Sequence, residues 1–239
     1  MSANPALQPT ESSQADQVFA STNILLRSIS FPVVLRTPKR LDNDQLLEFC
    51  AANDWLRIER NPAGELILMT PAAGKTSNRE GYLSRELDIW AEHDARGIAF
   101  NSNGGFSLPD GSVRAADAAW LSLQKWNSLS SDEQGKFFPF CPEFVIELRS
   151  PGDSVSELES KMADWMANGA QLAWLIDPLR KLVIVYRPGQ HPPPARNPPW
   201  RRPHRGLHSQ NATSLGVATF AFSVKRILRV RRIVSSPAQ

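Results

Sequence analysis

The sequence predicts a mixed α/β (α+β) protein in which helices flank a central sheet. Short apolar runs typical of strands are interleaved with amphipathic stretches at helical spacing. One helical stretch lies between two groups of strand-like runs, as a crossover connection does. An apolar share of 41%, with 7 Trp and 11 Phe, is enough to form one good-sized core in a chain of 239 residues.

The N-terminal part of this pattern is a helix followed by a hairpin. Asp42 is suited to cap a helix, which then carries an apolar stripe of Leu46, Leu47, Phe49 and Cys50. Residues 56–60 and 66–69 are two short apolar-rich runs. Pro62 and Gly64 lie between these runs and predict the turn of a β-hairpin.

The remaining elements alternate between the two periodicities. A second helix is expected over residues 77–92, where Leu83, Leu87 and Trp90 recur at helical spacing. The expected later elements are short strands at 98–101, 117–121 and 144–148, a helix at about 154–168, and a strand at 173–177 with its hairpin partner at 182–186. Together these runs supply the strands of the predicted sheet and the helices that cover it.

Charge divides the chain into unequal parts. Residues 1–186 contain 17 Lys and Arg against all 24 Asp and Glu, a balance of 17 − 24 = −7, whereas residues 187–239 contain the other 10 basic residues and no acid. We therefore predict a mostly disordered segment at 1–30, one folded domain at 31–189, and a Pro- and Arg-rich basic tail at 190–239.

The sequence also suggests where the protein acts. It contains no apolar run long enough to span a membrane and no N-terminal pattern typical of a secretory signal. Cys50 and Cys141 form neither a disulfide framework nor a metal knuckle. We expect a cytoplasmic protein that does not bind membranes, and the sequence leaves its oligomeric state open, with a homodimer as one alternative.

Several enzyme classes fit the sequence poorly. The segment LILMTPAAGKTS resembles the outline of a phosphate-binding loop, but Met69 stands where that motif needs glycine, and Pro71 removes an amide donor. A turn leading into a capped helix is the better interpretation. The four histidines contain no HExxH pair, and there is no GxSxG segment, so a zinc hydrolase or an esterase of that kind is not expected.

Two carboxylates occupy positions where apolar residues would be expected. Glu147 lies within the strand-like run FVIEL, and Asp117 opens the run DAAWL. A buried carboxylate needs a cation, a metal ion or a proton. Side by side on adjacent strands, the two acids would suit a hard ion such as Mg²⁺. The alternative is an ion pair between Glu147 and Arg149, on the same strand face, or another cation.

Two further residues are candidates for the same site. Ser154 and Glu157 match a capping box, and in the helix that follows Lys161 lies at the edge of the apolar stripe, from which its ammonium could extend toward the acids. The simpler alternative is an exposed pair between Glu157 and Lys161. Glu80 shares a helix face with Leu83 and is either a third acid or a residue that favours the positive end of the helix dipole.

This arrangement, an Asp on one strand, E-x-x-S-P on the next and a Lys two turns into the following helix, resembles the Uma-two family of restriction-endonuclease-like proteins, within the PD-(D/E)XK nuclease superfamily. The blocks LRIERNPAGELILMTPAAGKTSNRE, GGFSLPDGSVRAADAAWLS, CPEFVIELRSPGDSVSELESKMADWMANGAQLAWLIDP and VIVYRPG follow the family's order over roughly residues 40–189. The resemblance implies a restriction-endonuclease-like mixed central sheet flanked by helices.

The resemblance also implies a metal-dependent endonuclease that hydrolyses phosphodiester bonds of DNA. Asp117 and Glu147 would bind Mg²⁺ or Mn²⁺, with the Leu148 carbonyl as a further ligand, and Lys161 would orient the attacking water or stabilise developing charge. Arg149 stands where the superfamily motif has lysine and could hold a phosphate, because arginine stays protonated. Proline of the PD element is replaced by Ala116.

A second hypothesis has a different functional class. A non-catalytic binding or accessory protein could retain the same fold and keep Asp117 and Glu147 for structural reasons. The two hypotheses differ in whether a divalent metal binds the two acids, so a metal titration separates them.

Overall fold

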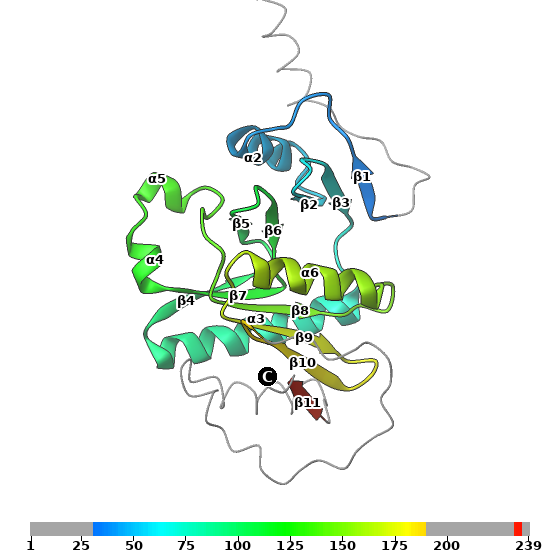
Figure 1. Cartoon of the computed structure of the whole chain (residues 1–239), viewed down its shortest axis with the longest axis vertical. Helices are drawn as coiled ribbons and strands as arrows, with labels where there is room; N and C mark the ends of the chain where they lie inside the picture. Colours follow the sequence, from blue (N-terminus) through cyan, green and yellow to red (C-terminus); the bar gives the residue numbers. More distant parts are fainter. Residues whose placement is uncertain (1–30, 190–231, 236–239) are drawn as a thin grey trace, which may run out of the picture. The chain divides into compact units, whose positions relative to one another are not determined.

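A computed structural model of the chain describes residues 31–189 and 232–235, which fall into two compact units divided after Pro71 (Figure 1). The predicted N-terminal segment 1–30 and the tail residues 190–231 and 236–239 lie outside the described residues. No helix in the described part of the chain has both the length and the apolar character needed to cross a membrane.

The first unit is a short helix beside a small antiparallel sheet. Its elements are β1 (Val33–Leu35), α2 (Asn43–Ala52), β2 (Arg57–Arg60) and β3 (Leu66–Met69). The predicted cap of α2 is confirmed, because the Asp42 carboxylate accepts from the Gln45 amide in a full capping box. The predicted hairpin is confirmed as well, since β2 and β3 pair antiparallel and β1 adds to the other edge of β3.

The second unit contains the central sheet. Its elements are α3 (Gly74–Asp94), β4 (Gly97–Asn101), β5 (Gly105–Ser107), β6 (Val113–Ala115), β7 (Ala118–Ser122), α4 (Leu123–Asn127), α5 (Ser131–Gln134), β8 (Phe144–Leu148), α6 (Val155–Ala167), β9 (Leu172–Asp177), β10 (Leu182–Tyr186) and β11 (Arg232–Ser235). Within the described residues the sheet has six strands in the order β11-β10-β9-β8-β7-β4. The β8–β9 and β10–β11 pairs are parallel and the others antiparallel, so the sheet is mixed.

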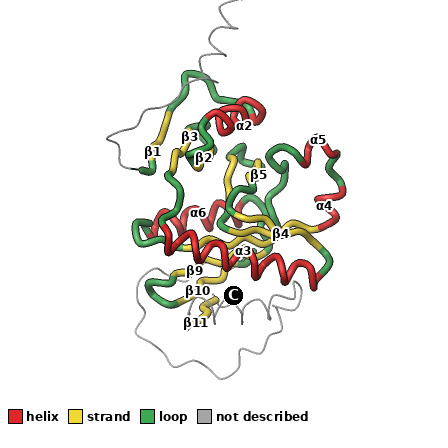
Figure 2. The backbone as a smooth tube through the Cα atoms, turned by 180° about the vertical axis from the view of Figure 1, so that it is seen from behind, coloured by secondary structure: helices red, strands yellow, loops and turns green. Residues whose placement is uncertain are grey.

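Helices cover both faces of this sheet. Figure 1 shows α6 across one face, and Figure 2, seen from behind, shows α3 across the other. Strand alternation divides β8 between the two layers, with Phe144, Ile146 and Leu148 packed in the cluster that contains the buried α3 residues, and Val145 in the cluster that contains Met162 and Trp165 of α6. The predicted fold class, a mixed sheet flanked by helices, is confirmed.

Three local predictions are corrected by the structure. Helix α3 begins at Gly74 and has no side-chain cap at Ala73, so the GKTS segment lies inside the helix rather than before it. Ser154 is the N-cap of α6, but the Ser154–Glu157 capping box is absent, because Ser154 Oγ instead lies 2.8 Å from Ser156 Oγ. Strand β7 begins at Ala118, so Asp117 precedes the strand instead of opening it.

Gly97 permits close packing at the start of β4. A Cβ atom at this position would lie 2.2 Å from Trp120 Cε2 and 2.5 Å from the Leu121 carbonyl oxygen, which is closer than atoms can pack. Gly81, in the middle of α3, has no atom within 4 Å of the corresponding Cβ position. The two glycines therefore respond in opposite ways to an added methyl group.

We predict that Gly97→Ala lowers the free energy of unfolding by about 1–3 kcal/mol through overpacking. The matched variant Gly81→Ala should raise it by up to about 1 kcal/mol, because alanine favours the helix. Urea unfolding followed by circular dichroism measures both. A Gly97→Ala protein as stable as the parent would contradict the packing described around Trp120.

Candidate active site

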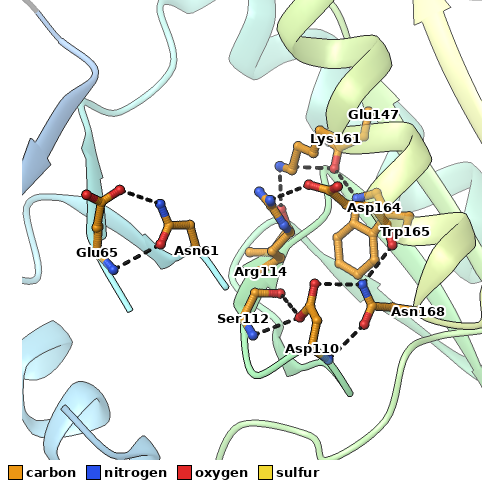
Figure 3. A network of polar contacts seen from close by, with 11 residues as sticks. Asn61, Glu65, Asp110, Ser112, Arg114, Glu147, Lys161, Asp164, Trp165 and Asn168 are labelled. Atoms are coloured by element: carbon orange, nitrogen blue, oxygen red, sulfur yellow. Dashed lines mark hydrogen bonds and ion pairs between the residues drawn. The ribbon is translucent and has the colours of Figure 1, made fainter. Parts of the chain in front are cut away.

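Glu147 is a carboxylate inside a buried strand. All of β8 is buried, and Glu147 is only 2% exposed. Its side chain points to the α6 side of the sheet, where the Lys161 ammonium lies 3.0 Å from Glu147 Oε1 (Figure 3). Trp165 Nε1 donates to the same oxygen at 2.8 Å. Of the three ways to stabilise this acid, the structure supplies a cation, reinforced by an indole hydrogen bond.

Lys161 is held between the sheet and a neighbouring strand. Its side chain is 15% exposed, and besides Glu147 its Nζ donates to the Ala115 carbonyl oxygen at 3.1 Å. Ala115 ends β6, so one ammonium group joins α6, β8 and β6. Lys161 therefore contacts Glu147, the acid with which the sequence analysis grouped it, although it lies thirteen residues beyond Leu148, the last residue of β8.

Asp117 directly precedes β7, the strand that pairs with β8. Ala118 of β7 pairs with Ile146 of β8, and continuing this register by one residue places Asp117 opposite Glu147. Asp117 is 6% exposed, and its Oδ2 accepts from the Leu148 amide at 2.6 Å. Leu148 therefore contacts Asp117 through its backbone N–H, and its carbonyl as a metal ligand remains a prediction.

The ion-pair alternative for Glu147 is wrong for Arg149, whereas its other form, a different cation, is what Lys161 supplies. Arg149 Nη1 lies 3.0 Å from Asp177 Oδ2, at the end of β9. Asp177 is fully buried, and it also accepts from Arg180 Nε at 2.6 Å and from the Arg180 amide at 2.9 Å. Burial by itself would raise the pKa of Asp177, but the hydrogen bonds from Arg180 and Arg149 outweigh burial and hold the pKa below its ordinary value.

Glu80 lies on α3, the helix on the face of the sheet opposite to α6 (Figures 1 and 2). It is half-buried on α3, four residues after Thr76. Thr76 Oγ1 lies 3.0 Å from Ser150 Oγ, so the first turns of α3 lie beside the loop that follows β8. Glu80 follows one turn further along α3, and its assignment as a third acid remains a prediction.

Sequence reasoning missed a second set of polar contacts that fixes α6. Arg114 of β6 is only 8% exposed, and its Nη2 lies 2.6 Å from Asp164 Oδ2 (Figure 3). One turn further along the helix, Asn168 Nδ2 donates to Asp110 Oδ2 at 2.9 Å. The signal available in the sequence was an arginine between the apolar residues of a strand, which poses the same problem as Glu147 does.

The oxygen donors at this site are of the kind that hard metal ions prefer. Asp117 and Glu147 offer carboxylate oxygens, and Mg²⁺ is commonly held by one or two carboxylates while it keeps several waters. Within residues 31–189 and 232–235, no group of three or more His, Cys, Asp or Glu side chains is arranged to hold a metal ion. Any metal site here would therefore use the two adjacent acids, backbone oxygen and water.

Comparison with known proteins identifies a family for this chain. The sequence matches the model of the Uma2 family, described as "Putative restriction endonuclease", over residues 43–215, which is more than half of the chain. A solved structure described as a putative nuclease belonging to DUF820, from Anabaena variabilis, is 24% identical with a TM-score of 0.49. That match covers 57% of this chain and 74% of the other. No curated protein matches this chain.

We predict that Lys161→Met lowers the free energy of unfolding by about 3 kcal/mol or more, because it leaves the Glu147 carboxylate buried without its cation. Adding Glu147→Gln to Lys161→Met should recover much of this loss. Chemical denaturation of the single and double variants tests both statements.

The control is Lys136→Met, since Lys136 pairs with Asp132 at the surface, where the two side chains are 42% and 84% exposed. This variant should lower the free energy of unfolding by less than about 1 kcal/mol. Equal losses in the two lysine variants would show that the Lys161–Glu147 pair does not stabilise the fold.

A pH series tests the role of Asp177. Because its folded pKa is depressed, Asp177 contributes stability that is present above its ordinary pKa of 3.8 and is lost as the pH falls through the folded value. The difference in unfolding free energy between the parent and Asp177→Asn should therefore narrow between about pH 5 and about pH 2. A difference that stays constant over this range would contradict the pairing with Arg149 and Arg180.

Proposed function

We propose that this chain, which belongs to the Uma2 family described as putative restriction endonucleases, is a metal-dependent endonuclease that hydrolyses phosphodiester bonds of DNA. The single observation that carries the proposal is the convergence of two acids and one amine. Asp117, directly before β7, lies opposite Glu147 of β8 when the β7–β8 register is continued by one residue, and the Lys161 ammonium lies 3.0 Å from Glu147 Oε1.

In the proposed site, two acids would bind the metal ion and one lysine would act on the water and the phosphate. Asp117 and Glu147 would hold Mg²⁺ or Mn²⁺, with the Leu148 carbonyl as a further ligand. When bound, the ion would polarise the scissile phosphate and lower the pKa of a coordinated water. Lys161 would orient the attacking water and stabilise the negative charge that develops on the phosphate oxygens.

The surrounding residues keep these groups in place. The Trp165 indole and the Lys161 ammonium both donate to Glu147 Oε1, which fixes the direction of that carboxylate. The Leu148 amide does the same for Asp117, and the Ala115 carbonyl limits the positions of the Lys161 ammonium. Such fixed donors and acceptors require little reorganisation during the reaction.

The charge of the chain bears on how DNA would be held. Phosphate contacts supply most of the non-specific affinity for DNA, yet residues 1–186 have a balance of −7. The 10 basic residues of 187–239 are the strongest source of electrostatic attraction to DNA in the sequence, and we propose that they contribute to binding.

A homodimer and a cytoplasmic location remain predictions.

One observation favours a second function, a non-catalytic accessory protein with the same fold. Glu147 is already balanced by Lys161 and Trp165, and both acids are at most 6% exposed. A purely structural network would look the same without a metal. The two functions differ in their response to divalent ions, so both can be tested with one set of variants.

We predict that the protein nicks or linearises supercoiled plasmid in Mg²⁺ or Mn²⁺ and not in EDTA. Glu147→Gln and Lys161→Met should reduce the rate at least about 100-fold, since each removes a group in direct contact with the reaction. Gel electrophoresis of timed samples measures the rate. Glu157→Gln and Lys136→Met are the matched controls and should cleave like the parent.

Metal binding has a readout that does not depend on cleavage. Mn²⁺ should raise the melting temperature of the parent, and Glu147→Ala should abolish this shift. Equal cleavage by the parent and Glu147→Gln would reject the catalytic assignment. A parent that neither cleaves DNA nor responds to Mn²⁺ would favour the accessory function.

A further inference from the structure

Three charged side chains gather at the carboxyl ends of the parallel strands β8 and β9. Arg149 follows β8, Asp177 ends β9, and Arg180 lies in the turn after it. Both guanidinium groups contact Asp177 Oδ2, at 3.0 Å from Arg149 Nη1 and 2.6 Å from Arg180 Nε. The carboxylate is fully buried, whereas the two arginine side chains are 18% and 32% exposed.

The positive charge of this cluster exceeds what Asp177 needs. Two guanidinium groups against one carboxylate leave a balance of 2 − 1 = +1. Each guanidinium has five N–H donors, but within the described residues Arg149 uses its Nη1 and Arg180 its Nε. Arg149 Nε is buried without a partner in that part of the chain. A buried donor left without an acceptor is costly and requires an explanation.

The cluster lies next to the proposed catalytic acids. Arg149 is two residues beyond Glu147, and its amide donates to the Ile176 carbonyl, so the strand pairing continues past the end of β8. Strand alternation therefore places Arg149 on the same side of the sheet as Glu147. The carboxyl ends of parallel strands are also where open α/β sheets usually bind their ligands.

We infer that Arg149 and Arg180 form a binding site for a phosphate of the DNA backbone that neighbours the cleaved bond. This inference rests on the proposed function and adds to it a contact outside the metal-binding acids. Asp177 is a positioning residue in this site, because it orients the two guanidinium groups through one oxygen atom. The planar fork of arginine suits a phosphate, which accepts parallel hydrogen bonds.

A purely structural role explains the Arg149–Asp177 pair but not the second guanidinium group, that of Arg180. Arg149 and the Arg180 amide already supply a cation and a backbone donor to Asp177, which is enough to keep the carboxylate ionised. The Arg180 side chain adds the charge that remains in excess, at the more exposed edge of the cluster. A phosphate oxygen would accept from guanidinium N–H groups other than the buried Arg149 Nε and balance that charge.

The test measures DNA binding in EDTA, where hydrolysis does not interfere. Fluorescence anisotropy of a short labelled DNA duplex gives Kd over a series of salt concentrations. Arg180→Gln and Arg149→Gln should each weaken binding by roughly 10-fold and reduce the slope of log Kd against log salt by about one. Arg149→Lys should keep the parent's salt slope while binding more weakly, because it keeps the charge and loses the fork.

Arg96→Gln is the matched control, since Arg96 also pairs with one carboxylate, that of Asp94, and its side chain is more exposed. It should bind DNA like the parent. Arg180→Gln or Arg149→Gln proteins that melt like the parent and bind DNA with its salt slope would overturn the inference. If the parent cleaves DNA and these variants bind normally, the inference fails and the proposed function stands. If binding depends on Arg180 but no cleavage occurs, the inference stands and hydrolysis is rejected.

Discussion

The structure depends on one electrostatic constraint, the presence of a carboxylate in the middle of a fully buried strand. Glu147 cannot stay ionised among apolar neighbours unless a partner arrives from another element. Lys161 and Trp165 are one turn apart on α6 and contact the same carboxylate oxygen, so the acid fixes both the position and the rotation of that helix. The contacts that pack α6 on the sheet are therefore also the contacts that form the candidate site.

The two faces of the sheet carry different chemistry as a result. The face toward α3 is packed with apolar side chains, among them Leu87, Trp90, Ile146 and Trp174. On the other side, charged side chains contact partners of opposite charge, and at least one member of each group is buried: Glu147 with Lys161, Asp177 with Arg149 and Arg180, and Arg114 with Asp164. The first face supplies hydrophobic stability, and the second places charged groups at fixed positions near the ends of β8 and β9.

This division explains why the same geometry suits an enzyme and an accessory protein. A nuclease needs carboxylates and an amine held in place before substrate arrives, and burial in a polar network provides that order. The same network also gives the Glu147 and Asp177 carboxylates their cations without any ligand. The excess positive charge at Arg149 and Arg180 is the feature that a self-contained structural network explains least well.

The sequence determined the fold class and the principal strands, and it singled out Asp117 and Glu147 as acids in buried segments, because burial leaves a periodic pattern that can be read locally. Strand β8 was predicted with the same bounds that the structure has, and the residues on its two faces were separated correctly. The short elements β1, β5, β6, α4 and α5 were missed, since runs of three to five residues hold too little periodicity. Only the tertiary structure decided which cation each acid meets. From spacing along the chain, Arg149 was a possible partner of Glu147. In the structure Arg149 instead contacts Asp177, 28 residues away in sequence. The cation that contacts Glu147 is Lys161, on helix α6 after β8. Ion pairs form between side chains that the strand register and helix packing bring within a few ångströms, and that proximity does not exist until the sheet has formed.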